Sequence, residues 1–444
     1  MPNPLLASAV ARAFLAGEQT VEEVTARASL ALGRNWRWLR TVAPRYIETF
    51  AGRTRPRHRD VVQFLLHDSD FHTACERYPF HMRVAHGLTG QPEPMQPVAA
   101  AETWDVPAIE STRALADWLF LNAGGLDWFA DLKGLGYSQH DRPLLRHYHY
   151  RVLTKKSGSI RLIEAPKPRL KELQRQILAE LLEKIPPHPA VHGFRKGRSI
   201  QTFAAAHVGK RVVLRMDLQN FFPSISGARI QTLFRTAGYP EAVADLLGGI
   251  CTNATPREVW CESANEMDPR ALWDLRKLYA RPHLPQGAPT SPALANLCAY
   301  RFDCRLDGLA KVAGADYTRY ADDLAFSGGE AFERRVEHFA ARVAAISMEE
   351  GFGVNHRKTR IMRQGVRQHL AGLVTNQRVN IPRADYDHLK AILTNCVRHG
   401  PESQNRNGHN RFRAHLDGRI GFVETIHSEK GQRLRALFER IHWI

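Results

Sequence analysis

The amino-acid sequence predicts an α+β fold in which an antiparallel sheet carries helices on one side. The run RVVLRMDL at 211–218 is a short apolar stretch typical of a buried strand. The run YTRYADDLAF at 317–326 is typical of a hairpin whose two arms meet at Ala321-Asp322-Asp323. Helical patterns surround these strands without the strict alternation of a parallel sheet, and this favours α+β over α/β.

Size and charge narrow the function. A chain of 444 residues is long for one domain, so two or three folding units are expected. Apolar residues make up 43% and charged residues 24%, which excludes disordered and fibrous classes. The net charge of +17 favours a polyanionic partner, nucleic acid before an anionic membrane surface. The alternative is a basic protein without such a partner.

Cysteine spacing and hydropathy indicate the compartment. The six cysteines form no C-x-x-C pair, so we expect reduced thiols and no cysteine-based zinc site. No apolar run approaches the roughly 20 residues of a membrane span. The apolar start lacks a basic region before it, so it is interpreted as a helix rather than a signal peptide. We expect a cytoplasmic protein without a membrane partner.

Residues 1–130 are predicted to form a helical extension. The segment 33–50 combines helical spacing with a basic face, and the next segment, GRTRPRHRD, is interpreted as a cationic loop. Gly90–Pro107 contains four prolines and is predicted to be a linker or an extended arm, before a helical stretch at 112–129.

Strand patterns begin after this extension, in a part predicted to span 131–380. Residues 147–166 alternate in polarity and carry a turn at 157–159, which indicates a hairpin. Helical faces follow at 171–184 and 332–351. Residues 381–444 are predicted to be helical with basic edges, as a third part.

Carboxylates stand where this fold would place them together. Asp217 ends the buried strand, and Asp322 and Asp323 lie at the hairpin tip. Carboxylates at strand ends are costly unless they are paired, and two such sites side by side can hold two Mg²⁺ ions about 3.5–4 Å apart. Such ions activate an attacking hydroxyl and stabilise a departing pyrophosphate. Taken alone, an Asp-Asp turn is more often merely solvated.

The acids belong to a set of seven sequence blocks that occur in a fixed order along the chain. They are SIRLIEAPKPRLKELQRQIL, HGFRKGRSI, RMDLQNFFPSI, LPQGAPTSPALANL, YTRYADDLAFS, GFGVNHRKTRI and LAGLVTN. Over about residues 145–444, the chain resembles a reverse transcriptase, specifically the bacterial retron type. The resemblance implies a right-hand polymerase fold with an antiparallel palm sheet, with fingers and palm at 131–380 and a thumb at 381–444.

The resemblance also implies roles for single residues. Asp217, Asp322 and Asp323 would bind two Mg²⁺ ions, with the backbone carbonyl of Leu218 completing one site. Lys358 would protonate the pyrophosphate. The residues implied in nucleotide binding are Arg161 for the triphosphate, Phe222 as the gate against a 2′-OH, Gln286 for the sugar or base, and Gly287 for close backbone approach. If the strand continues, Phe221 faces the opposite way, so only one of the two phenylalanines can be the gate.

Nucleic-acid contacts are implied in the second block and after it. The residues are Phe194 for stacking, Arg195, Lys196 and Arg198 for the template backbone, and His207. Two departures from the retron pattern stand out. Phe203 replaces an expected Asn in Asn-Ala-x-x-His, and Leu370-Ala371-Gly372 keeps only the Gly of Val-Thr-Gly. They weaken the expectation of a branched product and leave the polymerase chemistry untouched.

The resemblance implies an RNA-directed DNA polymerase that uses dNTPs. It would copy a cognate structured noncoding RNA from an RNA 2′-OH, keep the DNA product joined to that RNA, and serve in anti-phage defence, with a separate effector protein as a further partner. Two alternatives remain. One is another bacterial reverse transcriptase, defence-associated or intron-like, without a branched product. The other is a noncatalytic RNA-binding scaffold on a dead polymerase fold.

Overall fold

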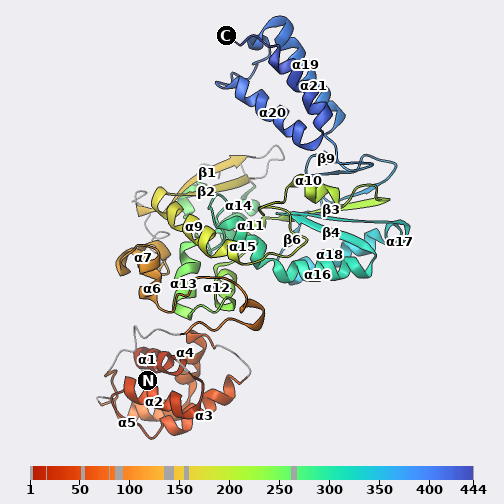
Figure 1. Ribbon diagram of the computed structural model, residues 1–444. Coiled ribbons are helices and arrows are strands. Elements are labelled where there is room, and N and C mark those ends of the chain that lie inside the picture. Colours follow the sequence, from red (N-terminus) through yellow and green to blue (C-terminus); the bar gives the residue numbers. More distant parts are fainter. Residues whose placement is uncertain are drawn as a thin grey trace. The chain divides into compact units, whose positions relative to one another are not determined.

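The computed structural model describes residues 4–16, 18–51, 56–79, 81–85, 94–134, 145–154, 160–261 and 268–443 (Figure 1). The chain forms two compact units, one of residues 1–185 and 226–290, the other of residues 186–225 and 291–444. Each unit combines separate stretches of the chain. The expected division into parts at 1–130, 131–380 and 381–444 therefore stays a prediction. No helix among the described residues is long and apolar enough to cross a membrane.

The first unit begins with a group of helices, coloured red to orange in Figure 1. They are α1 (Pro4–Leu15), α2 (Val21–Ala31), α3 (Leu39–Thr49), α4 (His58–His67) and α5 (Ser69–Arg77). Their apolar faces form one core, in which Phe14, Leu39 and Tyr46 are fully buried. The cationic segment after residue 51 was expected to be a loop, but its last residues, from His58, begin α4.

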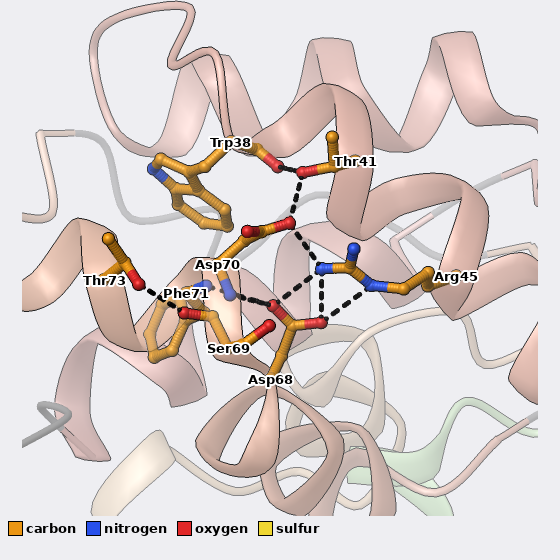
Figure 2. Close-up of polar contacts among 8 residues, drawn as sticks. All are labelled: Trp38, Thr41, Arg45, Asp68, Ser69, Asp70, Phe71 and Thr73. Atoms are coloured by element: carbon orange, nitrogen blue, oxygen red, sulfur yellow. Dashed lines mark hydrogen bonds and ion pairs between the residues drawn. The ribbon is translucent and has the colours of Figure 1, made fainter.

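A charged network joins two of these helices (Figure 2). Asp68 precedes α5 and accepts hydrogen bonds from the backbone N–H groups of Asp70 and Phe71, as an N-cap does. The guanidinium of Arg45, on α3, donates to Asp68 at 2.7 Å and to Asp70 at 2.8 Å. The hydroxyl of Thr41 donates to Asp70 at 2.8 Å. One arginine thus fixes the start of α5 against α3.

The rest of the first unit contains a hairpin and further helices. Its elements are η1 (Ala99–Ala101), α6 (Thr112–Trp118), α7 (Ala123–Ala130), β1 (Tyr148–Thr154), β2 (Ile160–Pro166), α9 (Pro168–Glu180), η3 (Leu182–Lys184), α12 (Gly227–Thr236), α13 (Glu241–Ile250), η4 (Arg257–Trp260) and α14 (Pro269–Tyr279). The antiparallel pairing of β1 with β2 confirms the expected hairpin. The turn expected at 157–159 lies outside the described residues.

Two expected segments of this unit differ in detail. The helical stretch expected at 112–129 is two helices, because α6 ends at Trp118 and Asn122 caps a new helix. In the segment expected as a linker or arm, residues 94–98 run along the end of α12, where the Gln96 N–H donates to the Gly238 carbonyl at 2.9 Å.

The second unit is built on an antiparallel five-stranded sheet. Its strands are β3 (Val212–Gln219), β4 (Ala315–Tyr320), β5 (Asp323–Gly328), β6 (Gly353–Val354) and β7 (Arg360–Arg363). The order is β4-β5-β3, and β3 pairs on its other side with β7 and then β6. A separate pair is β8 (His369–Leu370) with β9 (Leu373–Val374). The helices of this unit before its last stretch are α10 (Ile200–Ala205), α11 (Phe221–Ser224), α15 (Ser291–Cys298), α16 (Tyr300–Val312), α17 (Glu330–Glu333) and α18 (Val336–Glu349).

Three helices at the end of the chain complete the second unit. They are α19 (Arg383–His399), α20 (Phe412–Ile426) and α21 (Ser428–Glu439), with the short η6 (Pro401–Ser403) after α19. Leu393, Leu416 and Leu434 belong to one buried cluster with Val213 of the sheet. The basic residues of these helices therefore flank a shared apolar core.

Helices combined with an antiparallel sheet confirm the α+β prediction. One local expectation was wrong, because the helix expected at 332–351 is broken at Arg334-Arg335 into α17 and α18. The strand does not continue to Phe221 and Phe222, which lie in the helical turn α11, because the chain leaves β3 through Asn220, whose φ is +47°.

Candidate active site

The three candidate carboxylates meet at one end of the sheet. Asp217 on β3 and Asp323 on β5 are direct partners in the antiparallel ladder. Residues opposite each other in such a ladder have Cα atoms about 4.5–5.5 Å apart and side chains on the same face. The N–H of Leu218 donates to the carbonyl of Asp322 at 2.9 Å, so the turn residue is also tied to β3. The strand pairing therefore brings residues about a hundred positions apart in sequence together.

Two of the carboxylates have cationic partners. The Nζ of Lys358 lies 2.8 Å and 3.0 Å from the two oxygens of Asp217, whose Oδ1 also accepts from Asn355 at 3.3 Å. Arg215, on the same strand as Asp217, donates through Nε and Nη2 to one oxygen of Asp323, at 2.9 Å and 2.7 Å. Arg215 was not among the predicted site residues, since an arginine in a strand is usually a solvated residue.

Asp322 is in the least favourable position of the three. Burial raises the pKa of its carboxyl, and the negative charges of Asp217 and Asp323 raise it further. A half-buried carboxyl beside two acids is costly for a folded protein. Such clustering of acids is typical of sites that bind cations.

The donor set suits divalent metal ions as an open site. Carboxylates and a backbone carbonyl, here that of Leu218, are the hard oxygen ligands that Mg²⁺ prefers. Within the described residues, no group of three or more His, Cys, Asp or Glu side chains forms a ready-made metal site. At the hairpin, two of the three carboxylates are turned toward Lys358 and Arg215 instead. Mg²⁺ commonly takes only one or two protein carboxylates and fills its remaining positions with water and phosphate oxygens, so the open arrangement fits it.

Aromatic rings border the acids. Phe222 lies near the ring of Phe194, with centroids 6.2 Å apart, while Phe194 also lies 6.1 Å from Tyr320. Phe221 is buried and packs against Phe352, so of the two neighbours Phe222 is the more exposed. This agrees with the choice of Phe222 over Phe221 as candidate gate, and the role itself stays a prediction.

The basic loop before α10 presents its side chains outward. Lys196 and Arg198 are exposed and Arg195 is half-buried. Phe194 is 50% exposed and has a φ of +57°, a left-handed conformation that is unusual for a bulky residue. An exposed aromatic ring among cations is suited to stacking on a base, and the nucleic-acid contacts of this loop stay a prediction.

His207 contradicts its expected role. Its side chain is fully buried, and its Nδ1 and Nε2 lie 2.7 Å from the hydroxyls of Ser327 and Thr318. Both ring nitrogens are thus engaged by the sheet, which leaves none for a nucleic acid. The family pattern suggested the contact, and only the packing shows that this histidine joins α10 to β4 and β5.

Burial of His207 predicts a loss of stability in acid. Desolvation lowers the pKa of His207 to about 3, so the folded state keeps the ring neutral where the unfolded chain, near 6.5, takes up a proton. The group's contribution to stability is therefore intact above pH 6.5 and is lost as the pH falls toward 3. We expect His207→Gln to reduce the pH dependence of unfolding by up to roughly 1.4 kcal/mol per pH unit between pH 6 and 4.

Chemical denaturation of wild type and variant at several pH values in this range measures that slope. His192, whose pKa burial lowers to about 4, is retained in both proteins and contributes, with other shifted groups, to the pH dependence that remains. Equal slopes for wild type and His207→Gln would contradict the prediction.

The other nucleotide-binding candidates belong to the first unit. Arg161 is exposed on β2, opposite Leu153. The carbonyl of Gln286 accepts from the N–H of Glu164, also on β2, at 2.9 Å. Gly287 has a φ of +136°, and a Cβ there would lie 2.9 Å from the Glu164 carbonyl oxygen, so only glycine fits.

Glu164 itself holds this loop region together. Its carboxylate is fully buried and accepts hydrogen bonds from Asn253, Thr255 and His283 at 2.7, 2.8 and 3.0 Å. Sequence reasoning missed it, because nothing in the strand pattern of β2 distinguishes a buried glutamate from an exposed one.

Comparisons with known proteins identify the family of this chain. Residues 153–391 match the family described as "Reverse transcriptase (RNA-dependent DNA polymerase)". The chain is 42% identical over 303 residues to the retron Mx65 reverse transcriptase of Myxococcus xanthus, covering 67% of this chain and 66% of that protein. It is 36% identical over 342 residues to the retron Mx162 reverse transcriptase of the same organism, covering 74% and 66%.

A further relative is the retron Ec86 reverse transcriptase of Escherichia coli, 30% identical over 292 residues, covering 65% of this chain and 79% of that protein. The matched segment spans 66% of the length of each of the two Myxococcus proteins. The resemblance indicated by the seven sequence blocks is thereby confirmed. This chain belongs to the reverse transcriptase (RNA-dependent DNA polymerase) family and resembles its retron members.

Proposed function

We propose that this protein is a retron-type RNA-directed DNA polymerase. It copies a cognate structured noncoding RNA into DNA, starting from a 2′-OH of that RNA, and the DNA product stays joined to the RNA. The observation that carries the proposal is the meeting of Asp217, Asp322 and Asp323 at the end of the β3–β5 ladder, within a chain of this family. A role in anti-phage defence in the cytoplasm, with a separate effector protein, belongs to the same proposal.

The three acids and the Leu218 carbonyl would hold two Mg²⁺ ions. When bound, these ions supply activation of the attacking hydroxyl and neutralisation of charge on the phosphates. Arg161 binds the triphosphate through its fork of N–H donors, and Gln286 and Gly287 shape the pocket for the sugar and base. Lys358, a cation already beside Asp217, donates a proton to the leaving pyrophosphate.

The proposal includes the parts of a right-hand polymerase that the resemblance implies. Residues 131–380 would be the fingers and palm, 381–444 the thumb and 1–130 an extension. Phe194, Arg195, Lys196 and Arg198 contact the template strand. Phosphate contacts of this kind position a strand without reading its sequence, so recognition of the cognate RNA rests on its shape and loops.

Primer extension tests the proposal. The purified chain is incubated with an RNA template, an annealed DNA primer, dNTPs and Mg²⁺, and DNA synthesis is expected. Absence of synthesis with RNA binding retained would favour the noncatalytic scaffold. Sequencing of the nucleic acid that copurifies tests the retron part, because a DNA joined to RNA at a branch is expected. DNA synthesis without such a product would favour another bacterial reverse transcriptase.

We expect Phe222→Ala to admit ribonucleotides. Phe222 would pack against the sugar of the incoming nucleotide, where a 2′-OH distinguishes RNA from DNA precursors. Loss of the ring removes the steric barrier, so the preference for dNTPs over rNTPs should fall by roughly 10-fold or more, about 1.4 kcal/mol. The ratio of kcat/KM values for dNTP and rNTP measures it. Unchanged selectivity would mean that Phe222 is not the gate. Phe221→Leu is the control, and it should keep the wild-type preference for dNTPs.

A further inference from the structure

A fully buried ion pair lies directly behind the catalytic hairpin. Arg319, on β4, and Asp303, on α16, have no exposed side-chain surface. The Nε and Nη2 of Arg319 donate to the two carboxylate oxygens of Asp303, each at 2.7 Å, and the hydroxyl of Tyr317 donates to Oδ1 at 2.8 Å. Apolar side chains of similar volume would often stabilise a buried position as well as or better than an ion pair does. The contacts of the remaining Arg319 nitrogen, Nη1, therefore point to a role besides stability.

That donor contacts the turn residue directly before Asp322. The Nη1 of Arg319 lies 3.1 Å from the carbonyl oxygen of Ala321 and 3.1 Å from the Oδ1 of Asn296. Ala321 has a φ of +54°, a left-handed conformation that costs an alanine about 1–2 kcal/mol. The strained residue directly precedes Asp322, so the hydrogen bond from Arg319 helps to fix where that carboxylate lies.

The same network reaches the basic loop. Asn296, buried on α15, donates through Nδ2 to the carbonyl of Gly193 at 2.9 Å. The N–H of His192 donates to the carbonyl of Arg319 at 2.8 Å. The loop also packs closely, because a Cβ on Gly193 would lie 2.7 Å from the backbone nitrogen of Ala321. Phe194, the candidate stacking residue, follows immediately.

We propose that Arg319 and Asn296 are positioning residues of the polymerase. Through two side chains they fix the catalytic turn at Ala321 and the basic loop at Gly193 relative to each other. A nucleic acid held by the loop is thereby presented to the acids at a set distance. The inference rests on the proposed function. It predicts that loosening the network lowers kcat and weakens the response to Mg²⁺, while RNA affinity and the KM for dNTPs stay nearly unchanged.

Asn296→Ala tests this against a matched control. It removes the link to Gly193 and leaves the ion pair of Arg319 with Asp303 in place. Gln368→Ala is the control, because Gln368 is an equally buried amide of the same unit that donates to two backbone carbonyls, those of Lys210 and Met362, at 2.9 and 3.1 Å. Both variants should lose a few degrees of melting temperature.

Only Asn296→Ala should change the chemistry. We expect its kcat to fall roughly 10–100-fold, since a misplacement of about 1 Å can cost 10²-fold. Its midpoint for Mg²⁺ should rise several-fold, with RNA affinity and dNTP KM within about threefold of wild type, because phosphate contacts dominate that affinity. Gln368→Ala should keep wild-type kcat and Mg²⁺ midpoint per folded molecule.

A second pair of variants decides the question if Asn296→Ala does not fold. Gly193→Ala forces the loop and the turn apart, whereas a Cβ on Gly329, in the same unit, meets no atom within 4 Å. The Gly193 variant should show the kcat and Mg²⁺ effects and Gly329→Ala should not. Losses in the Asn296 and Gly193 variants that merely follow their folded fractions would overturn the inference. An inactive wild type would instead overturn the proposed function.

Discussion

Asp322→Asn is expected to abolish DNA synthesis and also to raise the melting temperature of the metal-free protein. Under the proposed function, the variant loses a metal ligand and with it several kcal/mol of charge stabilisation in the transition state, which corresponds to a fall in kcat of about 10³-fold or more. RNA affinity should stay within a few fold of wild type, because basic contacts to phosphates dominate it.

The gain in stability follows from the position of Asp322. Burial, Asp217 and Asp323 all raise the pKa of its carboxyl, so the folded state binds a proton more tightly than the unfolded chain. Stability contributed by this group is therefore present at low pH and is lost as the pH rises through the raised pKa. At neutral pH the ionised group opposes folding, and a neutral amide relieves that cost.

Asp217→Asn is the matched control. It should abolish synthesis as well, but Asp217 is paired with Lys358 at 2.8 Å, so its removal should lower the melting temperature or leave it unchanged. Thermal melts without metal and primer extension with Mg²⁺ give both readouts. Near-normal synthesis by Asp322→Asn would remove the site assignment. Equal destabilisation by both variants would contradict the account of electrostatic cost at Asp322.

The sequence predicted that the acids lie together, but not which strand pairing brings them there. β3 and the β4–β5 hairpin are coded by local patterns, an apolar run and a turn, and antiparallel pairing then places Asp217 opposite Asp323. Lys358 was predicted as a site residue because it lies in one of the seven sequence blocks. Its contact with Asp217 could not be predicted, because that contact depends on the path of the chain after β6.

The burial of polar residues could not be predicted from the sequence. Arg319 and Asp303 are ordinary charged residues by local pattern, and their partnership arises where β4 packs on α16. His207 was misinterpreted for the same reason, because a motif does not show whether a histidine faces an RNA or two hydroxyls. Burial is a property of the tertiary packing, which single-residue patterns do not encode.

Asp303→Leu is expected to produce the largest loss of stability. It leaves the guanidinium of Arg319 buried without its counter-charge, which typically costs about 3–5 kcal/mol. Asp307→Leu is the control on the same helix. Asp307 pairs with the largely exposed Lys311, and such a surface pair contributes only about 0–1 kcal/mol. Chemical denaturation followed by circular dichroism measures both, and similar losses would show that the buried pair is not the reason.

The double variant Asp303→Leu, Arg319→Leu separates folding from positioning. Replacement of a buried pair by apolar side chains is often neutral or stabilising, so most of the lost stability should return. Synthesis should stay impaired, because the carbonyl of Ala321 has lost its donor and the left-handed turn is no longer held. Recovery of stability and activity together would mean that Arg319 serves the core alone. Recovery of stability without activity would assign to this arginine the placement of Asp322.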